Sequence, residues 1–158
     1  QTNAYIYGVD ISNQFTINNS FFGIIKYSYL KGQDIKNNIP LIFMPPNSLF
    51  GSLKYRLKGS REVIKNVRAE ESEIELNNKY VFEQTNILIE QDFVPPPPGY
   101  NLFGLKVSTN LIFSNYKIRI FAKADNLFNI KYREYLNRQR YFSDDLGLSM
   151  TMGLNLKF

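Results

Sequence analysis

The chain has 158 residues and a formal net charge of +5, and it contains neither Cys nor His. Disulfides, cysteine-bound metals and histidine acid–base catalysis are therefore excluded. No Lys/Arg run reaches the length used for nucleic-acid patches, so we expect no nucleic-acid partner. Aromatic residues make up 15% of the chain, with 13 Phe and 11 Tyr. That content suits β-strands and membrane interfaces.

No apolar run reaches the roughly 18 residues that a membrane helix requires. The chain begins at Gln1 and carries no signal peptide, so we expect a processed chain or a fragment of a longer protein. Weak hydropathy does not exclude a transmembrane β-barrel, because only half of the side chains in a barrel strand face lipid.

The first half of the chain predicts three strands, over residues 4–17, 21–29 and 49–58, because apolar and polar residues alternate there. A polar turn at residues 18–20 joins the first two strands. Residues 31–47, with three prolines, predict a long loop. In the third strand Lys54, Arg56 and Lys58 share one face. Three cations on a strand face suit water, because in a core each would need a buried partner.

Residues 67–83 predict a fourth strand whose alternation changes phase, and a bulge near residues 70–72 would reconcile its two halves. Glu73 and Glu75 then lie on its polar face, where they could pair with the cations of the preceding strand. Residues 84–100 predict a second long loop, and the four prolines at 95–98 would make it a stiff, extended arm.

The last third predicts strands over residues 101–113, 117–125 and 147–158, with a third long loop over 126–146. The final strand has an unbroken apolar face, whereas its other face carries only small or polar residues and Lys157. Such a strand fits either a soluble sheet on a core or a barrel wall between lipid and a wet lumen.

The order of connections favours the barrel wall. Short turns alternate with long loops along all seven predicted strands, as in outer-membrane barrels, where tight turns lie at one rim and long loops at the other. A soluble, lipocalin-type barrel remains the alternative from pattern alone. Seven strands cannot close an up-and-down barrel, and an open edge in hydrocarbon leaves backbone groups unsatisfied. We therefore expect further strands, preceding Gln1.

A family resemblance is carried by the start of the third loop, where Asn126, Leu127, Phe128, Asn129 and Tyr132 form an Asn-Leu-Phe-Asn-x-x-Tyr motif. Together with the downstream Arg-Gln-Arg-Tyr-Phe segment and the final strand, it resembles the carboxy-terminal end of the TonB-dependent outer-membrane receptors. The final strand also fits the signal read by the barrel assembly machinery. Its matching positions are Thr151, Gly153, Leu156 and Phe158.

The resemblance implies an all-β fold: residues 1–158 would be the last seven strands of an antiparallel, transmembrane, 22-stranded β-barrel in the outer membrane of a Gram-negative bacterium. In that family a plug domain fills the lumen and a short box binds TonB. This chain contains neither, so we expect the remaining strands and plug from the same longer chain or from a partner chain. Outer-membrane lipid, the assembly machinery and, through the plug, the TonB complex are the other implied partners.

The function implied is import of a scarce ligand, such as a metal chelate, vitamin or oligosaccharide. The alternative is a structural scaffold in a multi-chain outer-membrane assembly without import of its own. An enzyme is not expected, because without His there is no ordinary Ser–His pair, and we expect no cofactor, metal site or catalytic residue. The candidate ligand contacts all lie in the loops, at Phe43, Met44, Arg133, Arg138, Arg140 and Tyr141.

Overall fold

Alternating apolar and polar residues place seven long strands side by side in one antiparallel sheet. The computed structural model describes residues 3–114 and 116–157. The long strands neighbour one another in chain order as β1 (Ala4–Asn18), β2 (Phe21–Asp34), β4 (Ser48–Arg56), β6 (Val67–Val81), β7 (Tyr100–Phe113), β8 (Tyr116–Asp125) and β9 (Ser149–Lys157). The short β3 (Ile39–Pro40) pairs with β2, and β5 (Arg61–Ile64) pairs with β6. Two 3-10 turns, η1 (Ile89–Gln91) and η2 (Arg138–Tyr141), lie in the loops.

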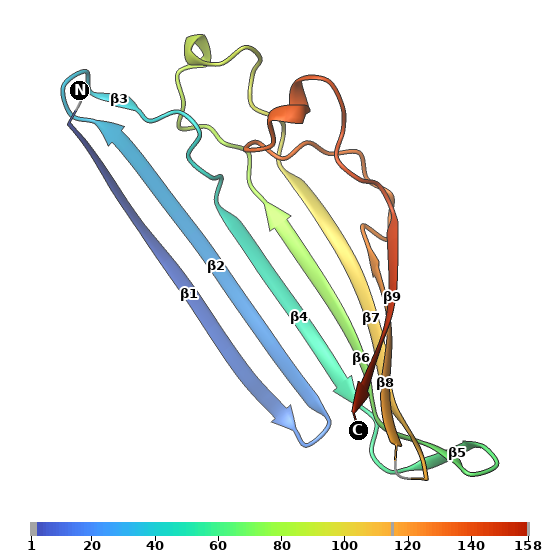
Figure 1. Cartoon of the computed structure of the whole chain (residues 1–158). Coiled ribbons are helices and arrows are strands. Elements are labelled where there is room, and N and C mark those ends of the chain that lie inside the picture. The colour runs from blue at the N-terminus through green and yellow to red at the C-terminus, as the bar shows by residue number, and fades with distance from the viewer. Residues whose placement is uncertain (1–2, 115, 158) are drawn as a thin grey trace.

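The sheet is curved and open, with β1 and β9 as its two edges (Figure 1). The predicted all-β, antiparallel architecture is therefore confirmed. Closure into a 22-stranded barrel stays a prediction, because the described strands do not close on themselves.

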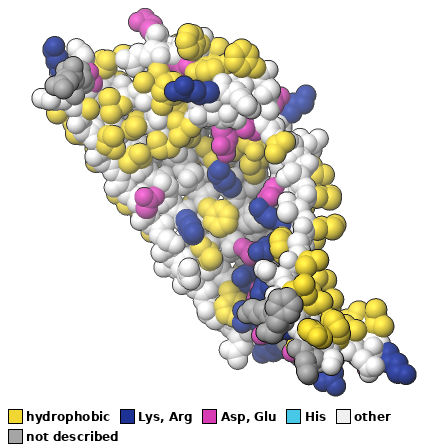
Figure 2. Space-filling model, viewed as in Figure 1, with side chains coloured by type: hydrophobic (Ala, Val, Ile, Leu, Met, Phe, Trp, Pro, Cys, Tyr) yellow, Lys and Arg dark blue, Asp and Glu magenta, His cyan; other side chains and the backbone are white. Residues whose placement is uncertain are grey.

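The two faces of the sheet differ sharply in polarity. One row across the strands places Leu53, Leu76 and Leu105 opposite one another, and the next row places Lys54, Glu75 and Lys106 together. The charged face is the concave one, since on that face a β6 side chain reaches across β7 to a β8 side chain. Figure 2 shows Lys, Arg, Asp and Glu side chains gathered on this face.

Two predicted details of the charged face are confirmed. Arg56 lies opposite Glu73 and pairs with it at 2.9 Å, and Lys54 lies opposite Glu75 at 3.9 Å. The register of β6 against β7 shifts between Glu70 and Glu73, which is the predicted bulge. The bulge brings both halves of the apolar pattern of β6 onto the convex face.

The connections differ from the prediction in two places. β2 continues to Asp34, inside the predicted first loop, because its end pairs with the start of β1 on one side and with β3 on the other. The predicted short turn after β4 is instead a hairpin, since Arg61, Glu62 and Ile64 of β5 pair with the start of β6. We call residues 57–67 the hairpin arm. The other two turns are tight, and the three long loops gather at the opposite end of the sheet (Figure 1).

Buried side chains are few and concentrate beneath the long loops. The buried hydrophobic residues of the described chain are Val81, Tyr100 and Tyr135. The convex face, by contrast, leaves large apolar side chains exposed on all seven long strands, for example Ile11 at 57% and Leu154 at 65%. None of the helical turns in residues 3–114 and 116–157 is long and apolar enough to cross a membrane.

Candidate ligand site in the long loops

The third loop, between β8 and β9, is fastened at its base by Asn126. This side chain is only 3% exposed. Its Oδ1 accepts a hydrogen bond from the Ile130 amide at 2.8 Å, and its Nδ2 donates to the Ile130 carbonyl at 2.8 Å and to the Leu146 carbonyl at 3.4 Å. Asn126 has a φ of 51°, in the left-handed region that Asn tolerates better than most residues. One side chain therefore joins both ends of the loop.

The other motif residues continue this anchorage. The Leu127 amide donates to the Phe103 carbonyl at 2.9 Å, and Phe128 packs edge-on against the Phe103 ring. Asn129 Oδ1 accepts a hydrogen bond from the Leu148 amide at 3.0 Å, just before β9 begins. A side chain at Gly147 would collide with that same oxygen. The motif thus sets where the loop leaves β8 and where the chain returns to β9.

A buried ion pair joins the third loop to the second. Arg140, in η2, binds Asp92, and their side chains are 2% and 1% exposed. Arg140 also donates to the Pro95 carbonyl at 3.4 Å, and its guanidinium lies over the rings of Tyr135 and Tyr141 at 4.9 and 4.6 Å. A buried cation needs such a set of partners, because leaving it unpaired is costly. We call these five residues the loop latch.

The Tyr141 hydroxyl adds a polar contact to the latch, and Tyr132 lies in the same loop. Tyr141 donates to Asp92 at 2.5 Å, and this hydrogen bond raises the pKa of Tyr141 because it stabilises the protonated phenol. Burial raises the pKa of Tyr132, and the nearby Asp145 carboxylate acts in the same direction.

The two adjacent acids of the third loop hold the loop together. Arg133 pairs with Asp144 at 2.6 Å and donates to the Arg140 carbonyl at 2.9 Å. Asp145 accepts hydrogen bonds from the Glu134 amide at 2.6 Å and from the Asn137 side chain at 2.8 Å. The acid pair therefore binds one cation and two amide groups of its own loop.

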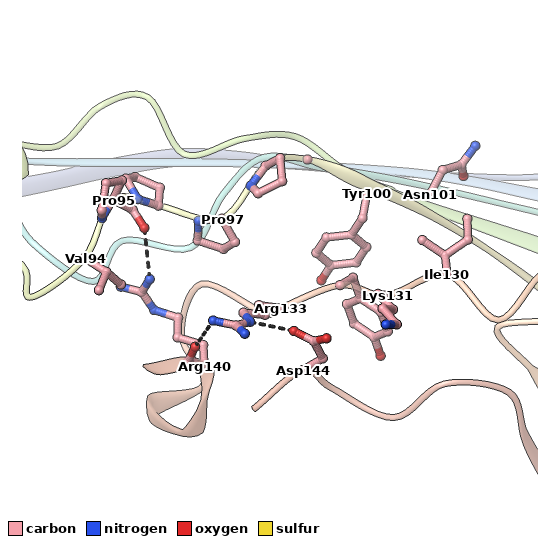
Figure 3. A pocket seen from close by; sticks show the side chains of 14 residues that line it. Val94, Pro95, Pro97, Tyr100, Asn101, Ile130, Lys131, Arg133, Arg140 and Asp144 are labelled. Carbon is pink, nitrogen blue, oxygen red and sulfur yellow. Dashed lines mark hydrogen bonds and ion pairs between the residues drawn. The ribbon is translucent and has the colours of Figure 1, made fainter. Parts of the chain in front are cut away.

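A cleft of about 650 Å³ lies between the proline arm of the second loop and the third loop (Figure 3). Residues 95–99 form one wall, and Arg133, Arg140 and Asp144 lie opposite (Figure 3). Tyr100 and Tyr132 close one end, with ring centroids 4.6 Å apart. Lys131 also lines the cleft, and it makes no ion pair within the described residues. The cleft thus offers aromatic rings, carbonyl oxygens and one available ammonium group.

The six predicted ligand contacts fall into different settings. Arg133 and Arg140 line the cleft but use their polar groups within the loops. Tyr141 belongs to the latch, and Phe43 packs on Tyr135 with ring centroids 6.4 Å apart.

The remaining two predicted contacts are not members of the latch. The Met44 carbonyl accepts a hydrogen bond from Gln84 at 2.8 Å. Arg138 is exposed and makes no ion pair among the residues that the structure describes. The prediction missed Asp92 and Tyr100, because nothing near them in the sequence marks a partner more than thirty residues away.

Three of the four assembly-signal residues lie on the edge strand β9. Gly153 is opposite Phe121, whose ring would lie 2.5 Å from an added Cβ, so the ring would have to move for any other residue. Leu156 is opposite Ile118 on the convex face, and Thr151 is opposite Lys123 on the concave face. Phe158 lies outside the described residues.

The described residues hold no group of three or more Asp or Glu placed to bind a metal ion. No known family profile matches the chain, and no curated protein sequence matches it. Among solved structures, the copper transporter OprC is similar, with a TM-score of 0.78 and 17% sequence identity over 97% of this chain. The chain spans 23% of the length of OprC. At this identity the likeness shows a shared fold and does not show a shared function.

Proposed function

We propose that this chain is a wall segment of a TonB-dependent receptor in the outer membrane of a Gram-negative bacterium, which imports a scarce ligand. One observation carries the proposal: apolar side chains cover the convex face of all seven long strands, while the concave face holds ion pairs. A soluble protein rarely leaves so large an apolar surface in water. A barrel wall requires this arrangement, with lipid outside and a polar lumen inside.

Two further observations support the proposal. The Asn126–Asn129 motif, which resembles the end of these receptors, is the base on which the third loop is built. The fold is also shared with a part of a protein named as a copper transporter. We propose no copper site here, because the chain has neither Cys nor His, which are common copper ligands.

The proposed role is non-enzymatic. The strands contact outer-membrane lipid, and the edges β1 and β9 pair with the remaining strands of a 22-stranded barrel, whose plug contacts the TonB complex. Thr151, Gly153, Leu156 and Phe158 form the assembly signal. The cleft beside Lys131 and the exposed Arg138 are the loop positions that we propose for ligand contact.

Cysteine labelling tests the membrane topology, since the chain has no native Cys. Leu53→Cys, on the convex face, is expected to react in intact outer membranes with a lipid-soluble maleimide and not with a charged one. Phe93→Cys, in the second loop at a position 93% exposed, is the matched control and reacts with both. Equal reaction of the two variants with the charged reagent would contradict the barrel.

Uptake experiments separate import from the scaffold alternative. One observation favours the scaffold alternative. The polar groups of Arg133, Arg140 and Tyr141 form ion pairs and hydrogen bonds within the loops. Radiolabelled metal chelates, vitamins and oligosaccharides would be offered to cells with and without the gene, each with and without TonB. Import predicts that one ligand class accumulates only in cells that have both the gene and TonB. A membrane topology that is confirmed without any such accumulation would favour the scaffold.

A further inference from the structure

The hairpin arm is an ordered element at the turn end of the sheet. Ile64 pairs with Val67, and Arg61 pairs with Ala69. The turn closes at Asn66, whose φ of 68° suits Asn and whose amide donates to Glu62 Oε1 at 3.2 Å. The only acid of residues 57–67 is therefore engaged inside the arm.

The arm carries an apolar tip that no other part of the described chain covers. Val63 and Ile64 are 59% and 68% exposed. In Figure 1 the arm projects beyond the tight turns and leans away from the hollow of the sheet. Because Ile64 lies opposite Val67, and Ala69 lies opposite Leu111 in β7, Ile64 continues the apolar convex face.

Four cations lie within or next to the arm. Lys58, Arg61, Lys65 and Arg68 are all exposed, and none makes an ion pair within the described residues. Several cations of the concave face do pair with acids, namely Lys54, Arg56 and Arg119. Figure 2 shows Lys and Arg side chains beside hydrophobic ones at this corner of the molecule.

We propose that the hairpin arm binds the anionic phospholipid surface of the leaflet at the turn end, with Val63 and Ile64 inserted at the headgroup level. This inference rests on the proposed membrane location. An apolar tip on an arm with several unpaired cations has the composition of a segment that lies in a membrane interface. The outward lean directs it to the lipid that surrounds the barrel. Aromatic rings at the same end, Phe113 and Tyr116 at 5.7 Å, suit the same depth.

The test uses an environment-sensitive fluorophore at Ile64→Cys in the full-length protein. The protein is reconstituted into vesicles of phosphatidylcholine, with or without phosphatidylglycerol, that contain lipid-borne quenchers. We expect quenching at this position to be stronger with phosphatidylglycerol. Replacing Arg61 and Lys65 with Gln is expected to lower the lipid-bound fraction relative to the water-exposed fraction by roughly five-fold per cation. Lys54→Gln, which removes a paired cation of the concave face, is the matched control and leaves the ratio unchanged.

A second probe at Leu53→Cys separates the two proposals. If lipid quenches neither probe, the membrane location itself is wrong. Quenching at Leu53→Cys with none at Ile64→Cys would overturn only the role of the arm. Equal quenching of Ile64→Cys in both vesicle types would overturn the requirement for anionic lipid. If the probe at Ile64→Cys were exposed to water in both vesicle types but shielded in whole cells, binding of the arm to lipid would also be overturned. That result would favour an acidic protein partner.

Discussion

Removing Asp92 from the loop latch should release the third loop. In Asp92→Ala the Arg140 guanidinium, 2% exposed, would keep its burial and lose its carboxylate. Breaking a buried pair from one side costs about 3–5 kcal/mol. That cost corresponds to an increase of about two to four orders of magnitude in the population of opened loop. The strands should remain intact, because the latch lies wholly in the loops.

Limited trypsin digestion measures the opening, because Arg138 lies in η2 beside the latch. Cleavage after Arg138 is expected to accelerate strongly in Asp92→Ala. In Arg133→Met it should accelerate only slightly, since that ion pair with Asp144 is 43% and 41% exposed and such pairs contribute about 0.2–1 kcal/mol. The double variant Asp92→Ala with Arg140→Met removes both charges, so it should resist cleavage better than Asp92→Ala alone. Equal cleavage of Asp92→Ala and Arg133→Met would refute the reasoning.

Three other outcomes follow from the structure. Gly147→Ala should lower the melting midpoint of the folded protein on heated gels, at a cost of about 1–3 kcal/mol in stability. The double variant with Asn129→Ala should lose less stability than the sum of the two single changes. Strict additivity of the two losses would argue against their contact. Gly153→Ala should reduce the folded protein in outer membranes, because the ring above it must move, whereas Gly51→Ala, with no atom within 4 Å, should not; equal losses would contradict this account. The raised pKa of Tyr141 means that the folded state holds this proton more tightly, so the latch is fully stable below the ordinary value of 10.0 and weakens as the pH rises further. Tyr141→Phe should therefore reduce the pH dependence of trypsin cleavage. An unchanged pH profile would count against this role of Tyr141.

The strands were predictable because apolar and polar residues alternate along each of them. Successive side chains in a strand point to opposite faces, so Lys54 and Arg56 share one face. Their charges predicted that this face contacts water, before their acidic partners were known. Even the bulge of β6 was visible, since an extra residue shifts the phase of the pattern. The hairpin arm was missed because Val63 and Ile64 are only two adjacent apolar residues, too few to show alternation.

The loop contacts were only partly predictable. The sequence marks Arg140 and Tyr141 as notable residues, but it does not reveal whether they face a ligand or a neighbouring loop. Asp92 lies 48 residues from Arg140 in the chain, so their pairing depends on how the sheet brings the two loop bases together. Asn126 was recognisable through its motif, and the structure supplies the physical reason, which is the double hydrogen bond to Ile130.

The carboxylate of Glu73 has a mechanical consequence for the wall. It binds Lys54 and Arg56 of β4 and, across β7, Arg119 of β8 at 3.2 Å. Strands two places apart in a flat sheet lie about 9–10 Å from each other, and the small Ser108 between them leaves room for the bridge and accepts a hydrogen bond from Arg119. Charge therefore draws this part of the wall inward, so its radius of curvature should respond to ionic strength, with the wall flattening as salt screens the bridge.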